Sequence, residues 1–205
     1  KMDAMYPIVS LGETAEKIAD DLEISRKDQD KFALESQQKA IDAINQGKFK
    51  NEICPISVPQ RKGDPLIVDI DEHPRYKKEN SEYSIDLTLE KLSSLKPIFR
   101  KNGTVTAGNS SGINDGAAAV LLMSREKADE LGLKPLARWV GSAVAGVDPS
   151  VMGYGPVPST EKLLKRFDLT LDDIGLIELN EAFASQSIGV MRKLNLNPDI
   201  TNVNG

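Results

Sequence analysis

The sequence predicts an α/β protein whose second half forms a mostly parallel sheet covered by helices. Candidate strands and helices alternate from Gly116 to the end of the chain, a pattern typical of parallel sheets. The apolar run 117–123 has the length of a strand and no polar alternation, which predicts a strand buried on both faces. The first hundred residues are rich in helix patterns and lack this alternation. Two differently built regions are therefore expected.

Helix signals come early in the chain. Capping-box patterns at 10–13 and 25–28 each precede apolar residues at helical spacing, so two helices are expected, the second ending near Gly47. A shorter helix is expected at 88–95, because Pro97 disfavours helical backbone in the residue before it.

Strands are expected between these helices, at 53–58 and 67–70. Pro55 places the first of them at a sheet edge, because proline cannot donate to a ladder. The polar, highly charged stretch 71–84 is the part of the chain least expected to fold. A loop of small residues follows at 103–116. After the apolar run we expect a helix from Ser124 to Gly132, a strand at 136–147, a helix from Ser159 to Phe167, a turn at 170–173, a strand at 176–179 and a helix from Asn180 to Leu194.

Composition excludes several classes of protein. The 205 residues carry 26 Lys and Arg against 31 Asp and Glu and only 5% aromatic residues, so the chain lacks the cationic surface and stacking platforms of a nucleic-acid binder. No apolar run approaches the roughly 20 residues that span a bilayer, so no membrane partner is expected. A single cysteine forbids an internal disulfide and suits a reducing compartment, so a cytoplasmic location is expected.

Cys54 and His73 are the only residues of their types, so Cys/His zinc sets are excluded and no metal is expected. A nucleophilic cysteine needs a lowered pKa from a cation or a helix N-terminus, but Cys54 has Glu52 and a proline as neighbours. We expect Cys54 to be a small buried side chain and His73 an exposed turn residue. A catalytic Cys–His pair within this chain is not expected.

Two features leave alternatives open. Asn180 follows a candidate buried strand, where α/β sheets place ligands, and it begins a candidate helix. It is either a helix N-cap or an amide aimed into a crevice to hold a water or a carbonyl. The loop 107–116 is either a tight connection or a place where backbone approaches an extended ligand closely, which small side chains permit.

Seven sequence blocks together resemble the thiolase family, the coenzyme-A-dependent acyltransferases. They occur in the family's order and span essentially the whole chain. The blocks are Leu11-Gly-Glu-Thr-Ala-Glu16, Ile24-Ser-Arg-Lys-Asp-Gln-Asp30 with Phe32-Ala33, Leu95-Lys-Pro-Ile-Phe99, Thr106-Ala-Gly-Asn-Ser-Ser-Gly112 with Asp115-Gly-Ala-Ala118, Met152-Gly-Tyr-Gly-Pro156, Asn180-Glu-Ala-Phe-Ala184 and Asn202-Val-Asn-Gly205.

The resemblance implies a fold of two related α/β halves that form a layered αβαβα core, with a helix-rich loop domain inserted to cover the coenzyme. In this chain residues 1–113 resemble the loop domain. Residues 114–134 resemble the end of the N-terminal half, and residues 135–205 resemble the start of the C-terminal half. The core in this chain is therefore expected to be partial.

The resemblance also implies ping-pong acyl transfer with coenzyme A (CoA) as a substrate and no cofactor. A cysteine thiolate takes the acyl group, a second cysteine moves the α-carbon proton, and a histidine with an asparagine-held water forms the oxyanion hole. Asn180 matches that asparagine, and Ser111 matches the serine that bonds the pantetheine arm. The other implied contacts are Ala107, Leu95, Phe99, Ala182 and Phe183 around the coenzyme, Arg75 near its adenine end, and Met152 at the acyl pocket.

The chain departs from the family pattern at the catalytic groups. The family's nucleophilic cysteine precedes residue 1 and its histidine follows residue 205, so Cys54 and His73 inherit neither role. Ser10 and the stretch 152–158 lean toward the degradative 3-ketoacyl-CoA branch. We therefore expect an internal fragment without activity of its own. The alternatives are a non-catalytic CoA or acyl-CoA binding module, or an interaction fragment. Uncovered strand edges would make it associate as a homo-oligomer.

Overall fold

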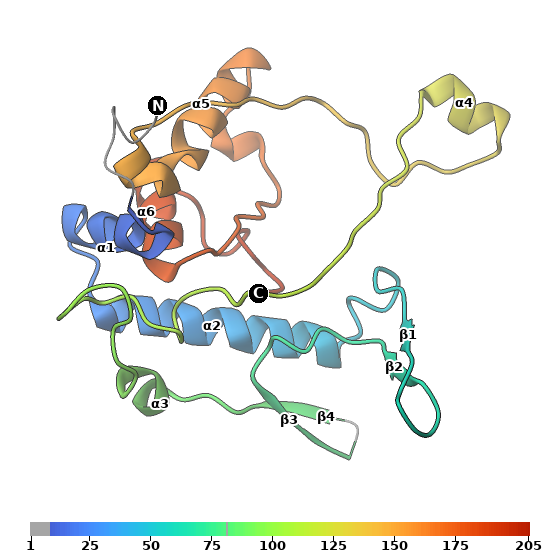
Figure 1. Ribbon diagram of the computed structural model, residues 1–205. Helices are drawn as coiled ribbons and strands as arrows, with labels where there is room; N and C mark the ends of the chain where they lie inside the picture. The colour runs from blue at the N-terminus through green and yellow to red at the C-terminus, as the bar shows by residue number, and fades with distance from the viewer. Residues whose placement is uncertain (1–8, 81) are drawn as a thin grey trace.

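The computed structural model describes residues 9–80 and 82–205 (Figure 1). Helices predominate, and the described strands form two small antiparallel sheets. No helix among the described residues is long and apolar enough to cross a membrane. In chain order the elements are α1 (Leu11–Asp21), α2 (Arg26–Asn45), β1 (Ile56–Val58), β2 (Leu66–Val68), β3 (Tyr76–Glu79), β4 (Glu82–Ile85), α3 (Leu89–Ser93), α4 (Arg125–Glu130), the 3₁₀ helix η1 (Pro149–Tyr154), α5 (Pro156–Arg166), the 3₁₀ helix η2 (Leu171–Asp173) and α6 (Ala184–Leu194).

The first two helices confirm the capping predictions. The Ser10 hydroxyl accepts a hydrogen bond from the Glu13 amide, and α1 starts at the next residue. At α2 the Ser25 hydroxyl accepts from the Asp28 amide while the Asp28 carboxylate accepts from the Ser25 amide, which completes a capping box. Gly47 follows the end of α2 with a φ of +69°, a conformation that glycine adopts without strain.

Helix α2 runs through the middle of the molecule. It packs against α6 on one side and against α3 and β4 on the other (Figure 1). The buried residues Ile18, Ala19 and Ile24 form one core cluster at α1. A second cluster lies on α6 and the chain after it, and consists of Val190, Leu194 and Leu196.

Two hairpins follow α2 in the chain, and the second of them packs against it. Strands β1 and β2 pair antiparallel with Ile56 opposite Val68, so the predicted strands at 53–58 and 67–70 are confirmed in part, each overlapping an observed strand. The expectation that 71–84 is the least folded stretch is wrong, because β3 and β4 pair there. The Tyr76 and Tyr83 rings meet edge to face across this hairpin. The Asn45 side chain bonds both the amide and the carbonyl of Tyr83, which attaches the hairpin to α2.

The predicted parallel sheet of the second half is wrong for the described residues. The runs 117–123 and 136–147 are extended but unpaired, and Val120 is 85% exposed. A strand buried on both faces needs neighbouring strands, and no hydrogen bond between backbone groups joins either run to another described segment. The candidate strand 176–179 is reduced to one parallel bridge, between Ile177 and Thr201.

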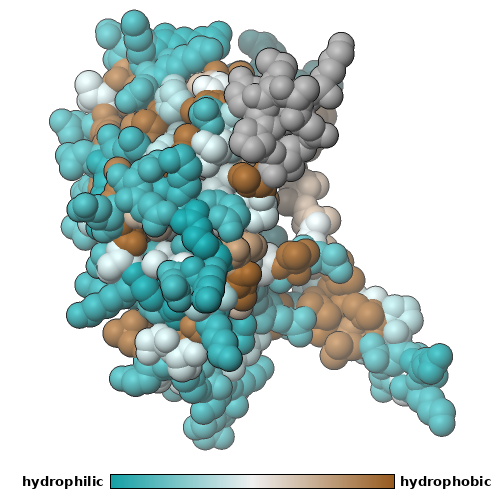
Figure 2. All heavy atoms as spheres, turned by 60° about the vertical axis from the view of Figure 1, so that its left-hand side comes forward, coloured by the Kyte–Doolittle hydropathy of each residue, from teal (hydrophilic) through white to brown (hydrophobic). Residues whose placement is uncertain are grey.

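Residues 112–148, which we call the arm, extend away from the remaining elements in their middle part, around α4. The arm returns beside α5, where the Lys162 and Arg166 side chains donate to the carbonyls of Val144 and Ser142. Figure 1 shows the chain leaving them, forming α4 and returning toward α5. Ser124 caps α4 through the Lys127 amide, as predicted. Figure 2 shows that hydrophobic side chains also reach the surface on the face that it presents. On the arm, the large exposed hydrophobic residues include Ile113, Val120, Leu121, Leu122, Leu136, Trp139 and Val144.

The last two helices begin at other residues than predicted. Helix α5 starts at Pro156 rather than Ser159, since proline is well tolerated in a first helical turn and Ser159 bonds back to the Gly155 carbonyl. Helix α6 starts at Ala184, with Phe183 as its N-cap. Asn180 is therefore not a helix N-cap. The mixture of helix and sheet agrees with the α/β class.

Candidate functional site

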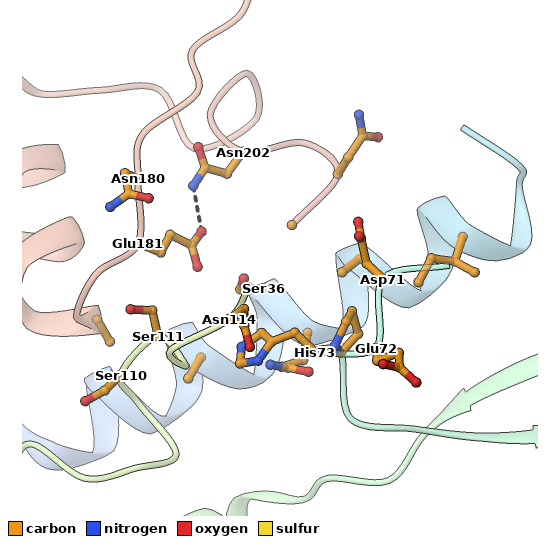
Figure 3. A pocket seen from close by; sticks show the side chains of 18 of the residues that line it. Ser36, Asp71, Glu72, His73, Ser110, Ser111, Asn114, Asn180, Glu181 and Asn202 are labelled. Atoms are coloured by element: carbon orange, nitrogen blue, oxygen red, sulfur yellow. Dashed lines mark hydrogen bonds between the residues drawn. The ribbon is translucent and has the colours of Figure 1, made fainter. Parts of the chain in front are cut away.

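A cavity of about 1120 Å³ opens where separate parts of the chain converge (Figure 3). One wall is α2, with Phe32 and Ser36 among its lining residues. The others are the stretch 70–74, the loop 108–115 and the C-terminal segments 178–181 and 202–205. This volume slightly exceeds the upper end of the range typical of small-molecule pockets, about 1,000 Å³, so the cavity has room for an extended ligand.

The loop before the arm is attached to the segment before α6. Ser110 and Phe183 form an isolated antiparallel bridge. The Ser111 amide donates to the Ala182 carbonyl at 3.0 Å, and the Ala184 amide donates to the Asn109 carbonyl at 2.9 Å. These bonds place Ser111 and Asn180 on the same cavity.

Buried Glu16 anchors the start of that loop. Its side chain comes from α1, and the residue is 1% exposed. The carboxylate accepts hydrogen bonds from the amides of Thr104 and Val105 at 2.8–2.9 Å and from the Thr104 hydroxyl at 3.0 Å. Gly103 lies so close to Glu16 that an added Cβ would overlap the carboxylate. The loop is thus held by a charge-assisted network rather than by a sheet.

Asn202 fixes the opposite wall. Its Oδ1 accepts from the Leu179 amide at 2.7 Å, and its Nδ2 donates to the Leu179 carbonyl at 2.8 Å and to Glu181 Oε1 at 2.6 Å. Its φ of +46° is left-handed, a conformation that asparagine tolerates better than most residues. Figure 3 shows this bond and the Glu181 side chain reaching toward the cavity. The side chain of Asn202 thus pairs with the backbone amide and carbonyl of Leu179, as a neighbouring strand would.

The charges around the cavity are unevenly distributed. Among the described residues its lining has no lysine or arginine but carries the carboxylates of Asp71, Glu72, Asp115, Glu178 and Glu181. Arg75 lines a smaller adjoining pocket together with Glu72, His73 and Tyr76. Partial burial and the nearby Tyr83 raise the pKa of Tyr76 above its ordinary value, so its phenol is neutral near pH 7. A cationic contact is available only at the Arg75 end of the described lining.

The predicted site residues fall into three groups. Ser111 and Asn180 line the cavity, and Arg75 lines the pocket beside it. Asn180 is exposed, and among the described residues its side chain makes no hydrogen bond, so its amide is available to a ligand. Met152 lies in η1, half exposed, and does not line the cavity.

The remaining predicted contacts flank the bridge. Phe99 meets Phe183 edge to face, with ring centroids 6.0 Å apart. Leu95, just after α3, lies against Gly108, where an added Cβ would overlap its side chain. Ala182 accepts the Ser111 bond, and Ala107 is exposed on the same loop. These four apolar side chains and Ala107 therefore belong to one neighbourhood but do not line the cavity itself.

The predictions for the one cysteine and the one histidine of the chain fare differently. Cys54 is exposed, so the prediction that it is buried is wrong; the short strand beginning at Ile56 has nothing packed over it there. His73 is exposed as predicted, but its ring lies against Gly112 and lines both pockets. Within residues 9–80 and 82–205 no cluster of His, Cys, Asp and Glu could hold a metal.

Sequence reasoning assigned no role to Glu16, Asn109, Glu181 or Asn202, which build the site. Each belongs to one of the quoted sequence blocks, so the blocks were the available signal. Their roles depend on partners far away in the chain, such as the 88 residues that separate Glu16 from Thr104.

Family models match most of the chain. The model of the thiolase N-terminal domain matches residues 2–126, and the model of the thiolase C-terminal domain matches residues 133–205. An acetyl-CoA acetyltransferase of Chromobacterium violaceum is 51% identical over 200 residues, which are 98% of this chain and 49% of that relative. A probable acetyl-CoA acyltransferase of Staphylococcus aureus strain COL is 53% identical over 195 residues, 95% of this chain and 47% of that relative.

Solved structures agree with these matches. The crystal structure of the Bacillus anthracis acetyl-CoA acetyltransferase superposes with a TM-score of 0.90 and 49% identity, over 97% of this chain and 48% of that one. The crystal structure of human mitochondrial 3-ketoacyl-CoA thiolase in complex with CoA superposes with a TM-score of 0.84 and 45% sequence identity, over 95% of this chain and 46% of that one. The chain thus spans about half the length of the relatives that it matches. It belongs to the thiolase family.

Proposed function

We propose that residues 1–205 supply the CoA-binding surface and one oxyanion-hole residue of a CoA-dependent acyltransferase. The reaction is thiolytic cleavage of a 3-ketoacyl-CoA or the reverse condensation of acetyl-CoA. The observation that carries this is the Ser110–Phe183 bridge, which puts Ser111 and Asn180 on one cavity. CoA is a substrate in this proposal, and no other cofactor is needed.

The charge distribution orients CoA in the site. The carboxylates that line the cavity would repel the phosphates, so the phosphates and adenine lie toward Arg75. The uncharged pantetheine arm lies along Ser111, with Ala107, Leu95, Phe99, Ala182 and Phe183 beside it. Met152 contributes to the acyl pocket although it lies outside the described cavity.

Asn180 acts on the thioester oxygen through a held water. Its side chain is exposed and is not used as a helix cap. A donor aimed at an oxygen that gains negative charge in the transition state typically contributes about 100- to 1,000-fold in rate.

Neither Cys54 nor His73 serves as nucleophile or base in this proposal. Cys54 is exposed near β1 and does not line the cavity that holds Asn180. Residues 1–205 alone are therefore expected to bind CoA without turning over. Residues 1–113 act as the loop domain, 114–134 as the end of the N-terminal half and 135–205 as the start of the C-terminal half of a layered αβαβα core. The unpaired Cys54 thiol is consistent with a cytoplasmic location.

The arm gives the chain a second property, association with copies of itself. Its extended runs carry exposed apolar side chains and unpaired backbone groups, which is the surface that strand pairing between molecules uses. Sedimentation velocity should show an oligomer, and a Leu121→Ser variant should shift it toward monomer. A monomeric wild-type protein at the same concentration would contradict this.

Calorimetric titration with CoA tests the binding proposal. We expect an affinity in the micromolar range for the wild type and a loss of about tenfold, or 1.4 kcal/mol, in Ser111→Ala. Ser124→Ala, on the arm, is the matched control and should bind like the wild type. Absence of binding in the wild type would reject the CoA surface, and thiolysis above the buffer rate would reject the statement that these residues do not turn over.

A further inference from the structure

We propose that Arg26 and Asp30 of α2 are positioning residues that set two walls of the CoA surface with a single ion pair. One wall is the chain just after α3 with Leu95, which lies beside the cavity rather than lining it, and the other is the loop that carries Ser111. The statement that these walls bind CoA rests on the proposed function. The geometry of the ion pair stands independently of it.

Arg26 holds the α3 wall. Its Nε donates to Asp30 Oδ2 at 2.8 Å, while its Nη2 donates to the carbonyls of Leu92 and Leu95 at 2.6 and 3.0 Å. The carbonyls at the end of a helix have no partner within the helix, so an arginine is a favourable partner for them. The position of Leu95 is thus tied to α2 through the guanidinium.

Asp30 holds the other wall. The residue is 3% exposed, and its Oδ1 accepts from Asn109 Nδ2 at 3.0 Å. Asn109 also donates to the Thr104 carbonyl at 3.1 Å and accepts from the Thr106 amide at 2.8 Å. The Asn109 carbonyl accepts a hydrogen bond from the Ala184 amide, so Asn109 also connects the loop to the start of α6.

The two oxygens of Asp30 therefore serve different walls. Oδ2 faces the guanidinium, and Oδ1 faces the loop. The walls meet at Gly108, where an added Cβ would overlap Leu92 and Leu95. A buried carboxylate that lost its cation would be strongly disfavoured, so the ion pair keeps its geometry and the loop bond with it. Removing the carboxylate should release both walls, whereas changing only the cation should release one.

Three variants separate these effects. Asp30→Asn removes the charge, and Asn109→Ala removes only the link to the loop. Arg26→Lys keeps a cation for Asp30 but lacks the planar fork that reaches Leu92 and Leu95. Asp129→Asn is the matched control, because Arg125 and Asp129 form the same i, i+4 pair in the arm with both side chains exposed. Calorimetry with CoA and amide hydrogen exchange at Ser111 and Leu95 are the readouts.

We expect Asp30→Asn and Asn109→Ala to weaken CoA binding about tenfold or more and to speed exchange at the Ser111 amide. Arg26→Lys should speed exchange at Leu95 and leave Ser111 near the wild-type rate, a split that a uniform loss of stability would not produce. If Asn109→Ala binds CoA within twofold of the wild-type affinity and its Ser111 amide exchanges at the wild-type rate, the proposal is overturned. This result decides the matter even if Asp30→Asn does not fold. If the wild type does not bind CoA, the proposed function is rejected. The exchange rates at Ser111 and Leu95 then show by themselves whether Asp30 and Arg26 position the two walls.

Discussion

The loop 103–111 and the arm 112–148 are consecutive in the chain and contain little regular structure, yet they differ in how they are held. Buried Glu16 and Asp30 bond the loop, and Phe183 pairs with its last turn. The arm has no buried anchor of this kind among the described residues. Its bonds to α5 are exposed ones, from Lys162 and Arg166 to backbone carbonyls, and large apolar side chains such as Val120 and Leu121 face solvent. Side chains that reach across the chain can therefore order irregular backbone, whereas apolar runs need neighbouring strands.

The same contrast separates the two kinds of function proposed here. The anchored loop presents Ser111 at fixed positions relative to Asn180, which suits a binding site. The arm presents unpaired backbone and apolar side chains, which suits association. Substitutions made in matched pairs, one in the anchored part and one in the arm, test this division.

Truncating an isoleucine to alanine should give the largest difference in unfolding free energy between the anchored part and the arm. Ile18 is fully buried in the α1 cluster, so Ile18→Ala should lower the free energy of unfolding by about 3–4 kcal/mol through lost burial and a cavity. Ile113→Ala, in the exposed arm, should change it by less than about 0.5 kcal/mol. Urea unfolding followed by circular dichroism measures both. Equal losses would mean that the arm is packed.

Glutamate neutralisation should give the next largest difference. Glu16→Gln places an amide NH₂ against the Thr104 and Val105 amides and leaves buried donors without an acceptor, so we expect a loss of about 3 kcal/mol. Glu126→Gln on α4 is the control, because Glu126 is exposed. The same unfolding experiment applies, and a loss below about 1 kcal/mol in Glu16→Gln would show that the network does not anchor the loop.

Removal of a helix cap should give a smaller contrast. Ser25→Ala breaks the capping box of α2, which lies in the middle of the molecule, and should cost about 1 kcal/mol. Ser124→Ala removes the corresponding cap of α4 in the arm, and should leave the unfolding midpoint unchanged because α4 does not share the core. A lower midpoint in both variants would indicate that α4 unfolds together with the rest.

The smallest effect concerns Asp148, where the arm ends. Hydrogen bonds from the Ser150 hydroxyl and amide hold the pKa of this carboxyl below its ordinary value. The stabilisation is therefore present above about pH 4 and is lost as pH falls through the lowered pKa. An NMR titration should give a midpoint below that of an unstructured aspartate, and Ser150→Ala should raise it. A midpoint at or above the unstructured value would show that the cap does not form.

Local sequence signals predicted the helices better than the strands. The caps at Ser10, Ser25 and Ser124 act within four residues, so α1, α2 and α4 start where the pattern places them. The strands predicted at 117–123 and 136–147 depend on neighbours that no local pattern supplies. The alternative that Asn180 caps a helix failed for the same reason, because Asn202 keeps the segment before it extended from a distance of 23 residues.

Prediction of the site had the same limit. The family resemblance singled out Ser111 and Asn180, and the cavity brings both together. It gave no role to Glu16, which acts on the site through the amides of the loop, or to Asn109, whose side chain bonds Asp30 and the Thr104 carbonyl. Residues that touch a ligand can be matched by motif, whereas residues that hold them require the contacts of the fold.

Amide hydrogen exchange with and without CoA tests the central claim most directly. In the free protein the amides of Thr104, Val105, Ser111 and Ala184 should be protected, while those of 117–123 should exchange freely at concentrations too low for association. Added CoA should slow exchange further at Ser111 and leave 117–123 unchanged. Free exchange at Ser111 in both states, or protection by CoA confined to the arm, would contradict a preformed CoA surface on the anchored loop.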